Sequence, residues 1–373
     1  MKYIPVFDIK LGSREKKYVN LCLKNSWLGQ GQYVEKFEKK LCRFVGTKFC
    51  VSTSSGTTAL HLACASIDLT AGDEVLVSSS TNMASVFSII YCGAKPIPVD
   101  ISKENWQLKF DDLKKKITKK TKAIMVVHLF GHSVDMDPIL KIANKFNLKI
   151  IEDCAESLGV KYKGKNVGTL GDVAAFSFYA NKTITSGEGG MLATNSRKIF
   201  EKAKKLKNLA YGKKNKFQHE LIGFNYRLPN VSAAIGLAQL EGIKGIFKQK
   251  KRIYERYKKN LENIPGINIP KIEKWNTRYI MWVFNIYLDK KFPISRNLLQ
   301  KKLYKLNIET RNAFVPANQQ KTLIKKYPSF KLFKCPEADY IMKNGLYLPS
   351  GNTITNKEID RICLEIKKIS KHV

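Results

Sequence analysis

The sequence predicts an α/β protein, with a mostly parallel central sheet covered by helices on both faces and a smaller C-terminal α/β domain. The first observation is that short, apolar, β-branched runs alternate with stretches of helical periodicity between residues 45 and 195. Strands joined by helical crossovers form parallel sheets that are buried on both faces. The second is a change after residue 195 to long helical stretches. The third is the length of 373 residues, which suits one large and one smaller domain.

Five apolar runs in the first half are the predicted strands, and they span residues 49–51, 75–77, 96–99, 123–127 and 149–152. The stretches between them have helical spacing, and we predict helices at 57–66, 83–92 and 135–146. Ligands of such sheets bind beyond the carboxyl ends of the strands. The residues that follow each run are therefore candidates for a binding site.

The second half is expected to form a surface helix at 196–208, long helices at 229–262 and a strand at 280–288. We place the domain boundary in the helical stretch around 240–250. Residues 1–245 then form the large domain with an N-terminal arm, and residues 246–373 form the small C-terminal domain.

Basic residues outnumber acidic ones by 66 to 31, which gives a formal net charge of +35. Such a charge can attract nucleic acid, a membrane surface or a phosphorylated substrate. The lysines are spread along the whole chain, without a basic tail or a known nucleic-acid motif. We therefore interpret them mainly as solvated surface residues and expect neither a nucleic-acid nor a membrane partner. A basic protein that binds nucleic acid or an anionic surface is the alternative of another class.

The apolar runs and the cysteines bear on location and on metal binding. No apolar run approaches the roughly 20 residues that span a bilayer. The first residues lack the apolar core of a secretory signal, so we expect a soluble, cytoplasmic protein. None of the eight cysteines has C-x-x-C spacing and the five histidines are scattered. We predict reduced core cysteines and no metal site.

The first candidate site segment is residues 52–61, where a strand ends at Val51, a loop of small residues follows and a helix opens near Thr57. Unpaired backbone N–H groups at a helix start, beside hydroxyls and Gly56, form a cradle for an anion such as phosphate. The alternative is an ordinary Ser/Thr helix cap.

Two charged residues at strand ends are the other candidates. Asp153 ends the strand at 149–152, where a carboxylate can hold a proton on a heterocyclic nitrogen or cap the next helix. Lys182 follows an apolar strand and precedes hydroxyl residues and three glycines. A lysine in a dry pocket can form a Schiff base, and a lysine at the mouth of a turn is the alternative.

Together, a phosphate cradle, a strand-end acid and a lysine are the parts that hold pyridoxal 5′-phosphate. The lysine forms an imine with the aldehyde, the acid keeps the pyridine nitrogen protonated and the helix start binds the phosphate. The sequence thus resembles the fold-type I, pyridoxal-phosphate-dependent nucleotide-sugar aminotransferases over nearly its whole length. The resemblance is carried by residues 55–63, 72–75, 127–131, 151–156, 176–182, 223–227 and 233–241.

The resemblance implies roles for cofactor residues. Lys182 is implied as the catalytic Schiff-base lysine and proton shuttle, and Asp153 as the partner of the ring nitrogen. The remaining implied cofactor contacts are Glu156 near the ring hydroxyl, Gly56, Thr57 and Ser177 at the phosphate, and Asn82 beside the ring. Residues 1–245 are then the cofactor-binding domain.

The resemblance also implies partners. Asn225 is expected to reach the phosphate of a neighbouring subunit's cofactor, which makes the active unit a homodimer with shared sites. Glutamate is the implied amino donor. The implied acceptor is a phosphorylated keto substrate, specifically a nucleotide-linked 4-keto-6-deoxysugar for surface-glycan biosynthesis. Some relatives carry histidine at the lysine position and run a dehydration, so Lys182 favours transamination.

The substrate-binding residues that the resemblance implies are His128, Arg311 and Asn318. Asn82 stands where the family has an aromatic ring that stacks on the cofactor, and losing that ring forfeits about 0.5–1.5 kcal/mol. Asn318 stands where the family has a histidine, and the proline after Arg311 is missing. The alternative substrate is therefore a smaller phosphorylated ketone without a nucleotide.

Overall fold

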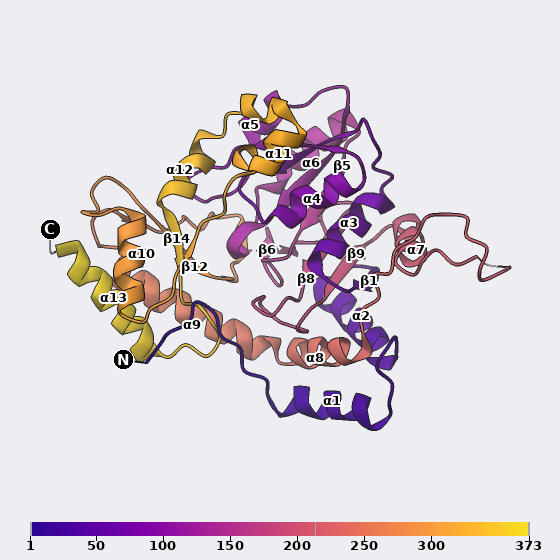
Figure 1. The fold of residues 1–373 in the computed structure, drawn as a ribbon, viewed down its shortest axis with the longest axis horizontal. Helices are drawn as coiled ribbons and strands as arrows, with labels where there is room; N and C mark the ends of the chain where they lie inside the picture. Colours follow the sequence, from indigo (N-terminus) through magenta and orange to yellow (C-terminus); the bar gives the residue numbers. More distant parts are fainter. Residues whose placement is uncertain (1, 213, 372–373) are drawn as a thin grey trace.

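The computed structural model describes residues 2–212 and 214–371 and has a seven-stranded sheet at its centre (Figure 1). The strand order is β1-β9-β8-β5-β4-β2-β3, and only β9 runs antiparallel to its neighbours. This confirms the predicted mostly parallel sheet. The strands are β1 (Phe49–Thr53), β2 (Glu74–Ser78), β3 (Lys95–Val99), β4 (Thr121–Val127), β5 (Lys149–Asp153), β8 (Val173–Ser177) and β9 (Gly190–Thr194).

Helices cover both faces of this sheet because its strands are apolar on both faces. In β2, Leu76 packs into one hydrophobic cluster while Val75 and Val77 pack into another on the opposite face. The first cluster includes residues of α2 (Gln32–Val45), α6 (Met136–Phe146) and α8 (Asn230–Glu241). The second includes residues of α3 (Gly56–Ser66), α4 (Met83–Tyr91) and α7 (Arg197–Leu206). The predicted helices of the first half are thus confirmed.

A second, four-stranded sheet organises the C-terminal part, in the order β10-β12-β14-β13. These strands are β10 (Ile267–Asn268), β12 (Phe284–Leu288), β13 (Arg311–Asn312) and β14 (Gly345–Leu348). The helices around them are α9 (Ile243–Leu261), α10 (Arg296–Lys305), α11 (Lys321–Lys326), α12 (Pro336–Asn344) and α13 (Asn356–Lys371). The predicted domain boundary after residue 245 falls in the first turn of α9 and stays a prediction.

The remaining elements connect these two sheets. They are α1 (Ser13–Lys24), α5 (Phe110–Lys115), a small sheet of β6 (Lys161–Tyr162), β7 (Lys165–Asn166) and β11 (Asn276–Arg278), and the 3-10 turns η1 (Leu129–Gly131), η2 (Ala317–Gln319) and η3 (Pro328–Leu332). The N-terminal segment lies against the C-terminal part, where Ile4 N–H donates to Asn307 O at 2.8 Å. Among the described residues, no helix is both long and apolar enough to cross a membrane.

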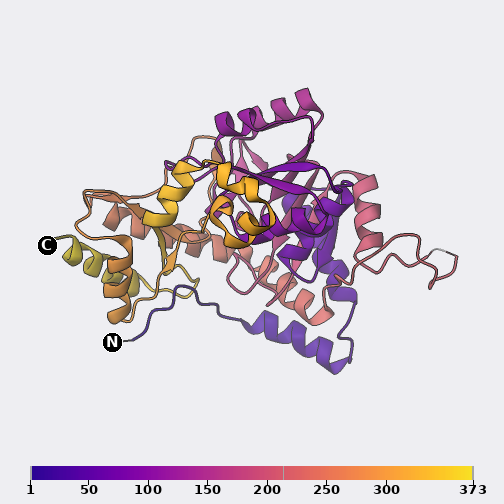
Figure 2. The ribbon, with the colours of Figure 1, turned by 45° about the horizontal axis from the view of Figure 1, so that its top comes forward.

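The predicted strand at 280–288 was too long, because β12 begins only at Phe284. The backbone carbonyl of Trp282 accepts a hydrogen bond from Lys250 Nζ at 2.8 Å, and the backbone N–H of Trp282 donates to Phe130 O at 3.4 Å. These contacts turn residues 280–283 away from the sheet. The described residues that follow α7, 207–212 and 214–222, extend away from the body of the molecule (Figure 1, Figure 2).

Candidate active site

A cavity of about 330 Å³ lies beyond the carboxyl ends of β1, β4, β5 and β8. The structure brings eight of the predicted site residues together around it. They come from separate strand ends, as expected for a sheet of this topology. The eight are Gly56, Thr57, Asn82, His128, Asp153, Glu156, Ser177 and Lys182.

The start of α3 forms one wall of the cavity. Ser55 caps the helix, because its Oγ accepts from Thr58 N–H at 3.1 Å. The helix cap predicted as the alternative is therefore present. The N–H groups of Gly56 and Thr57 lie in the first turn, where a helix offers them no carbonyl, so an anion can still bind there. A Cβ on Gly56 would lie 2.6 Å from the Cβ of Ser177, so only glycine lets the helix start approach β8 this closely.

Asp153 lies at the end of β5 with 4% of its surface exposed. Its carboxylate accepts from Ser85 Oγ at 2.7 Å and from Ala155 N–H at 3.0 Å. Burial is the largest influence on its pKa, and it raises that pKa against the lowering effects of these bonds and of nearby Lys182. The two bonds fix the direction of a carboxylate that lines the cavity.

Lys182 lies between a carboxylate and an aromatic ring. Its Nζ is 3.3 Å from Glu156 Oε1 and 4.0 Å from the centre of the Trp282 ring. Glu156 also accepts from Phe130 N–H at 3.0 Å, and burial raises its pKa despite the nearby lysine. The indole N–H of Trp282 donates to Asn181 O at 2.7 Å. The amine is thus held in place by a carboxylate on one side and an indole face on the other.

Sequence reasoning missed several residues of this cavity, above all Trp282, Asn181 and Tyr347. The buried Oδ1 of Asn181 has no hydrogen-bond partner within the part of the chain that the structure describes. Trp282 stacks on Phe130, with ring centres 5.8 Å apart and planes inclined by 10°. The only signal for Trp282 was a large aromatic inside a predicted strand, a pattern that indicates a core residue.

His128 lines the cavity but its ring nitrogens are both bonded inside the protein. Nδ1 accepts from Val134 N–H at 3.1 Å, and Nε2 lies 3.0 Å from Glu152 Oε2. The acceptor role of Nδ1 makes Nε2 the protonated nitrogen that donates to Glu152. Burial raises the pKa of Glu152, yet bonds from His128 and from backbone N–H groups outweigh it and the pKa is lowered. A hydrogen bond from His128 to a substrate would require one of these bonds to break, and that role stays a prediction.

Three predicted residues lie outside this cavity. Arg311 lines an adjoining cavity of about 500 Å³ that shares Trp282 and Tyr347 with the first, and it pairs with Glu309 at 2.5 Å. Asn318 is buried, donates to Phe333 O at 3.4 Å and lines neither cavity. Asn225 is exposed on the segment between α7 and α8. Their predicted contacts with substrate or with a neighbouring cofactor stay predictions.

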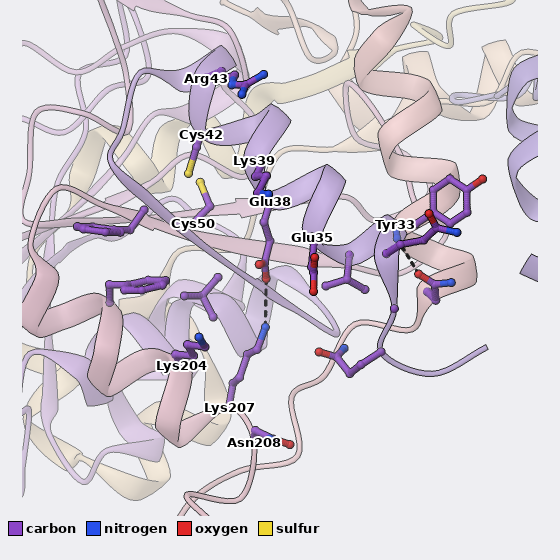
Figure 3. A pocket seen from close by; sticks show the side chains of 18 of the residues that line it. Tyr33, Glu35, Glu38, Lys39, Cys42, Arg43, Cys50, Lys204, Lys207 and Asn208 are labelled. Carbon is purple, nitrogen blue, oxygen red and sulfur yellow. Dashed lines mark hydrogen bonds and ion pairs between the residues drawn. The ribbon is translucent and has the colours of Figure 1, made fainter. Parts of the chain in front are cut away.

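A larger cavity of about 1270 Å³ lies elsewhere, between α2, β1 and α7 (Figure 3). It holds an ion pair of Glu38 and Lys207 at 3.2 Å, and the sulfur atoms of Cys42 and Cys50 point toward each other. All eight cysteines are free thiols, and six of them are buried, as predicted. No predicted site residue lines this cavity.

Comparison with known proteins decides the family. Residues 10–367 match the DegT/DnrJ/EryC1/StrS aminotransferase family. The chain belongs to this family. It is thus a pyridoxal phosphate-dependent aminotransferase, and the predicted enzyme class, cofactor and fold are confirmed.

Individual members of the aminotransferase family match over nearly full length. GDP-perosamine synthase of Escherichia coli O157:H7 is 41% identical over 99% of both chains. The same enzyme of Vibrio cholerae is 39% identical over 98% of both chains. Among solved structures, DesV of S. venezuelae superposes with a TM-score of 0.92 and 27% identity over the whole of both chains.

The residues of the smaller cavity fit pyridoxal phosphate. The open N–H groups of α3 suit a phosphate, and a Cβ on Gly56 would close the approach between α3 and β8. The buried Asp153 suits a ring nitrogen, and the unpartnered Oδ1 of Asn181 leaves an acceptor for a bound group. Lys182 is the lysine that the cavity offers to an aldehyde.

Proposed function

We propose that this aminotransferase moves the amino group of glutamate to a nucleotide-linked 4-keto-6-deoxysugar in surface-glycan biosynthesis. The observation that carries the proposal is the meeting of Lys182, Asp153 and the start of α3 in one cavity. The 41% identity to GDP-perosamine synthase over nearly the whole chain supports a nucleotide-sugar acceptor. The adjoining cavity of about 500 Å³ provides space for a large substrate beside the cavity of Lys182.

Each residue has a physical task in this proposal. Pyridoxal phosphate, when bound, supplies an aldehyde that reacts with amines and a ring that withdraws electrons. The first-turn N–H groups of α3 and Ser177 would hold its phosphate, and Asp153 would keep a proton on its ring nitrogen. The carboxylate of Glu156 would offer a hydrogen-bond acceptor beside the ring of the cofactor. Lys182 would supply the amine that reacts with the aldehyde and, when free, would be placed to carry the proton that leaves the carbon of the amino donor.

The proposed active unit is a cytoplasmic homodimer in which Asn225 of one subunit reaches the phosphate in the other. Asn225 is exposed and lies outside the cavity of its own chain, which supports a role toward a second copy. Ile222, three residues earlier, is 90% exposed, and Trp27 is 61% exposed. Large apolar side chains exposed in this way favour burial against a partner.

The test is a panel of ketones, each presented with glutamate while 2-oxoglutarate is measured. We expect turnover with a GDP- or dTDP-linked 4-keto-6-deoxyhexose, and none with Lys182→Ala. The second candidate, a smaller phosphorylated ketone, is favoured by Asn82 and Asn318, which depart from the family pattern. If ketose phosphates are aminated while no nucleotide sugar turns over, the proposed acceptor is wrong and the second candidate holds.

A further inference from the structure

Lys250 is a completely buried lysine in the middle of α9, outside both cavities of the site. Its Nζ donates to Trp282 O and to Ser350 O, each at 2.8 Å, and lies 5.4 Å from the centre of the Phe7 ring. Neither acceptor is a carboxylate. Burying an amine away from any counter-charge is costly, so an ordinary core position would carry an apolar residue instead.

The two carbonyls to which Lys250 donates belong to segments beside the adjoining cavity of about 500 Å³. Ser350 Oγ accepts from Phe284 N–H at 2.8 Å, and Ser350 N–H donates to Val6 O at 2.9 Å. These bonds tie the start of β12, the end of β14 and the N-terminal segment together. Val6 and Phe7 line the adjoining cavity of about 500 Å³, and Trp282 lines both this cavity and the one of about 330 Å³.

Trp282 connects Lys250 to the reacting amine. Its backbone oxygen accepts from Lys250, while its indole N–H donates to Asn181 O and its ring face lies 4.0 Å from Lys182 Nζ. Trp282 is 3% exposed, and the side chain of Lys182 is 11% exposed. A shift of the Trp282 backbone would therefore move the surface on which Lys182 rests.

We propose that Lys250 is a positioning residue for transamination: it clamps the carbonyls of Trp282 and Ser350 and thereby fixes the indole that holds Lys182. The proposal rests on the proposed function of Lys182. Without Lys250, two buried carbonyls lose their donor, and the wall can relieve this only by moving or by admitting water.

The experiment measures the reactivity of Lys182 in cofactor-free protein, by brief acylation with acetic anhydride and peptide mapping. The variants are Lys250→Met, Trp282→Phe and the double variant, with Lys251→Met as control, because Lys251 is 77% exposed on the same helix. We expect Lys250→Met to speed acylation of Lys182 about threefold or more, since the ring contact and its cover are lost. The double variant should react no faster than the faster single variant, because both changes act through one contact.

A role limited to stability would give a different pattern. Acylation of Lys182 at the wild-type rate in folded Lys250→Met, or effects of the two single variants that multiply, would overturn the proposal. In cofactor-loaded protein we expect kcat to fall about tenfold in Lys250→Met, with KM for glutamate changed less than about twofold. If Lys250→Met does not fold, Lys250→Gln, which keeps one amide donor, carries the same measurements. Altered acylation in a protein that aminates no ketone would leave the clamp standing and refute the proposed function instead.

Discussion

Two lysine–glutamate pairs line two separate cavities of this molecule, and only one of the pairs is arranged for chemistry. Lys207 is 3.2 Å from Glu38 in the 1270 Å³ cavity, and Lys182 is 3.3 Å from Glu156 in the 330 Å³ cavity. Lys207 also donates to Ser52 O at 3.1 Å and Ser52 Oγ at 3.4 Å. The amine of Lys207 is thus bonded to three oxygen atoms within the protein, as expected for an ion pair with a structural role.

Lys182 has a single, long bond to a carboxylate and otherwise faces an indole ring. Its amine can therefore leave this position at little cost. Glu156 is 5% exposed, and burial raises its pKa, whereas the Glu38 side chain is 24% exposed. The comparison teaches that the reactive lysine is the one whose amine has few hydrogen bonds within the protein. Neither the cavity volume nor the distance between lysine and glutamate identifies it.

The largest expected effect separates the two lysines directly. Lys182→Ala should lower kcat by about 10⁴-fold or more, because among the described residues no other amine lines that cavity to bind the aldehyde and carry the proton. Lys207→Ala is the matched control and should keep turnover per folded molecule within about twofold. Steady-state assays with glutamate measure both. Equal losses in the two variants would erase the distinction between the pairs.

Next in size is the acid that complements Lys182. Asp153→Asn keeps the shape of the side chain but removes its negative charge, so a proton on a ring nitrogen loses its partner. We expect kcat to fall about 10²–10³-fold while the cofactor still binds, as for removal of a catalytic acid–base group. Absorbance spectra report binding and initial rates report kcat. A variant with wild-type kcat would show that Asp153 only caps the loop after β5.

A third buried lysine, Lys250, extends the comparison to an amine without a carboxylate. Burial lowers its pKa from an ordinary 10.5 to about 7. Between these two pH values the unfolded chain binds more protons than the folded chain, so the free energy of unfolding rises with pH, by at most about 1.4 kcal/mol per pH unit. Below pH 7 this contribution is flat. Denaturant unfolding of wild type and Lys250→Met from pH 7 to 10 isolates it, and a difference that does not change with pH would contradict the lowered pKa.

A smaller effect is expected from removing the ion pair of Lys207 and Glu38. Lys207→Met leaves Glu38 with only the N–H and Oγ of Ser52 as donors, at 2.8 and 2.7 Å. We expect the free energy of unfolding to drop by about 1–3 kcal/mol, because the half-buried Glu38 carboxylate and the carbonyl of buried Ser52 both lose a donor. Urea denaturation measures it, with exposed Lys251→Met as control. No loss would mean that water replaces Lys207 without cost.

The smallest expected effect concerns Asn82. Its Oδ1 accepts from Ala84 N–H at 3.0 Å and caps α4, while the residue also lines the small cavity. Asn82→Phe should tighten cofactor binding by about 2–10-fold through ring stacking, at a cost of about 1 kcal/mol in stability from the lost cap. Cofactor titration measures the affinity for the cofactor, and thermal unfolding measures the stability. Weaker cofactor binding would show that the ring of Phe cannot enter the cavity.

Sequence alone predicted the parts of the site that depend on local pattern. The runs that became β1, β4 and β5 are apolar and β-branched, so their carboxyl ends, and with them Asp153, could be placed. Lys182 stood out because an apolar strand leads into it and glycines follow.

The missed parts depend on how distant segments dock. Trp282 reaches Lys182 from a stretch 100 positions away, and its carbonyl bonds to Lys250 instead of a neighbouring strand. That bond is also why the predicted strand at 280–288 was too long. Asn318 was expected at the substrate, yet it lies away from both cavities because η2 packs it against Phe333. No periodicity in the sequence contains these contacts.

The position of the N-terminal segment has a practical consequence. Ile4 pairs with Ile308, and residues 6–9 line the adjoining cavity of about 500 Å³, so residues 4–9 contribute to the wall of the site. Trimming this segment would open the adjoining cavity and remove the Phe7 ring that lies beside Lys250. Purification tags and surface tethers are better attached at the opposite terminus, after α13, which lines neither cavity.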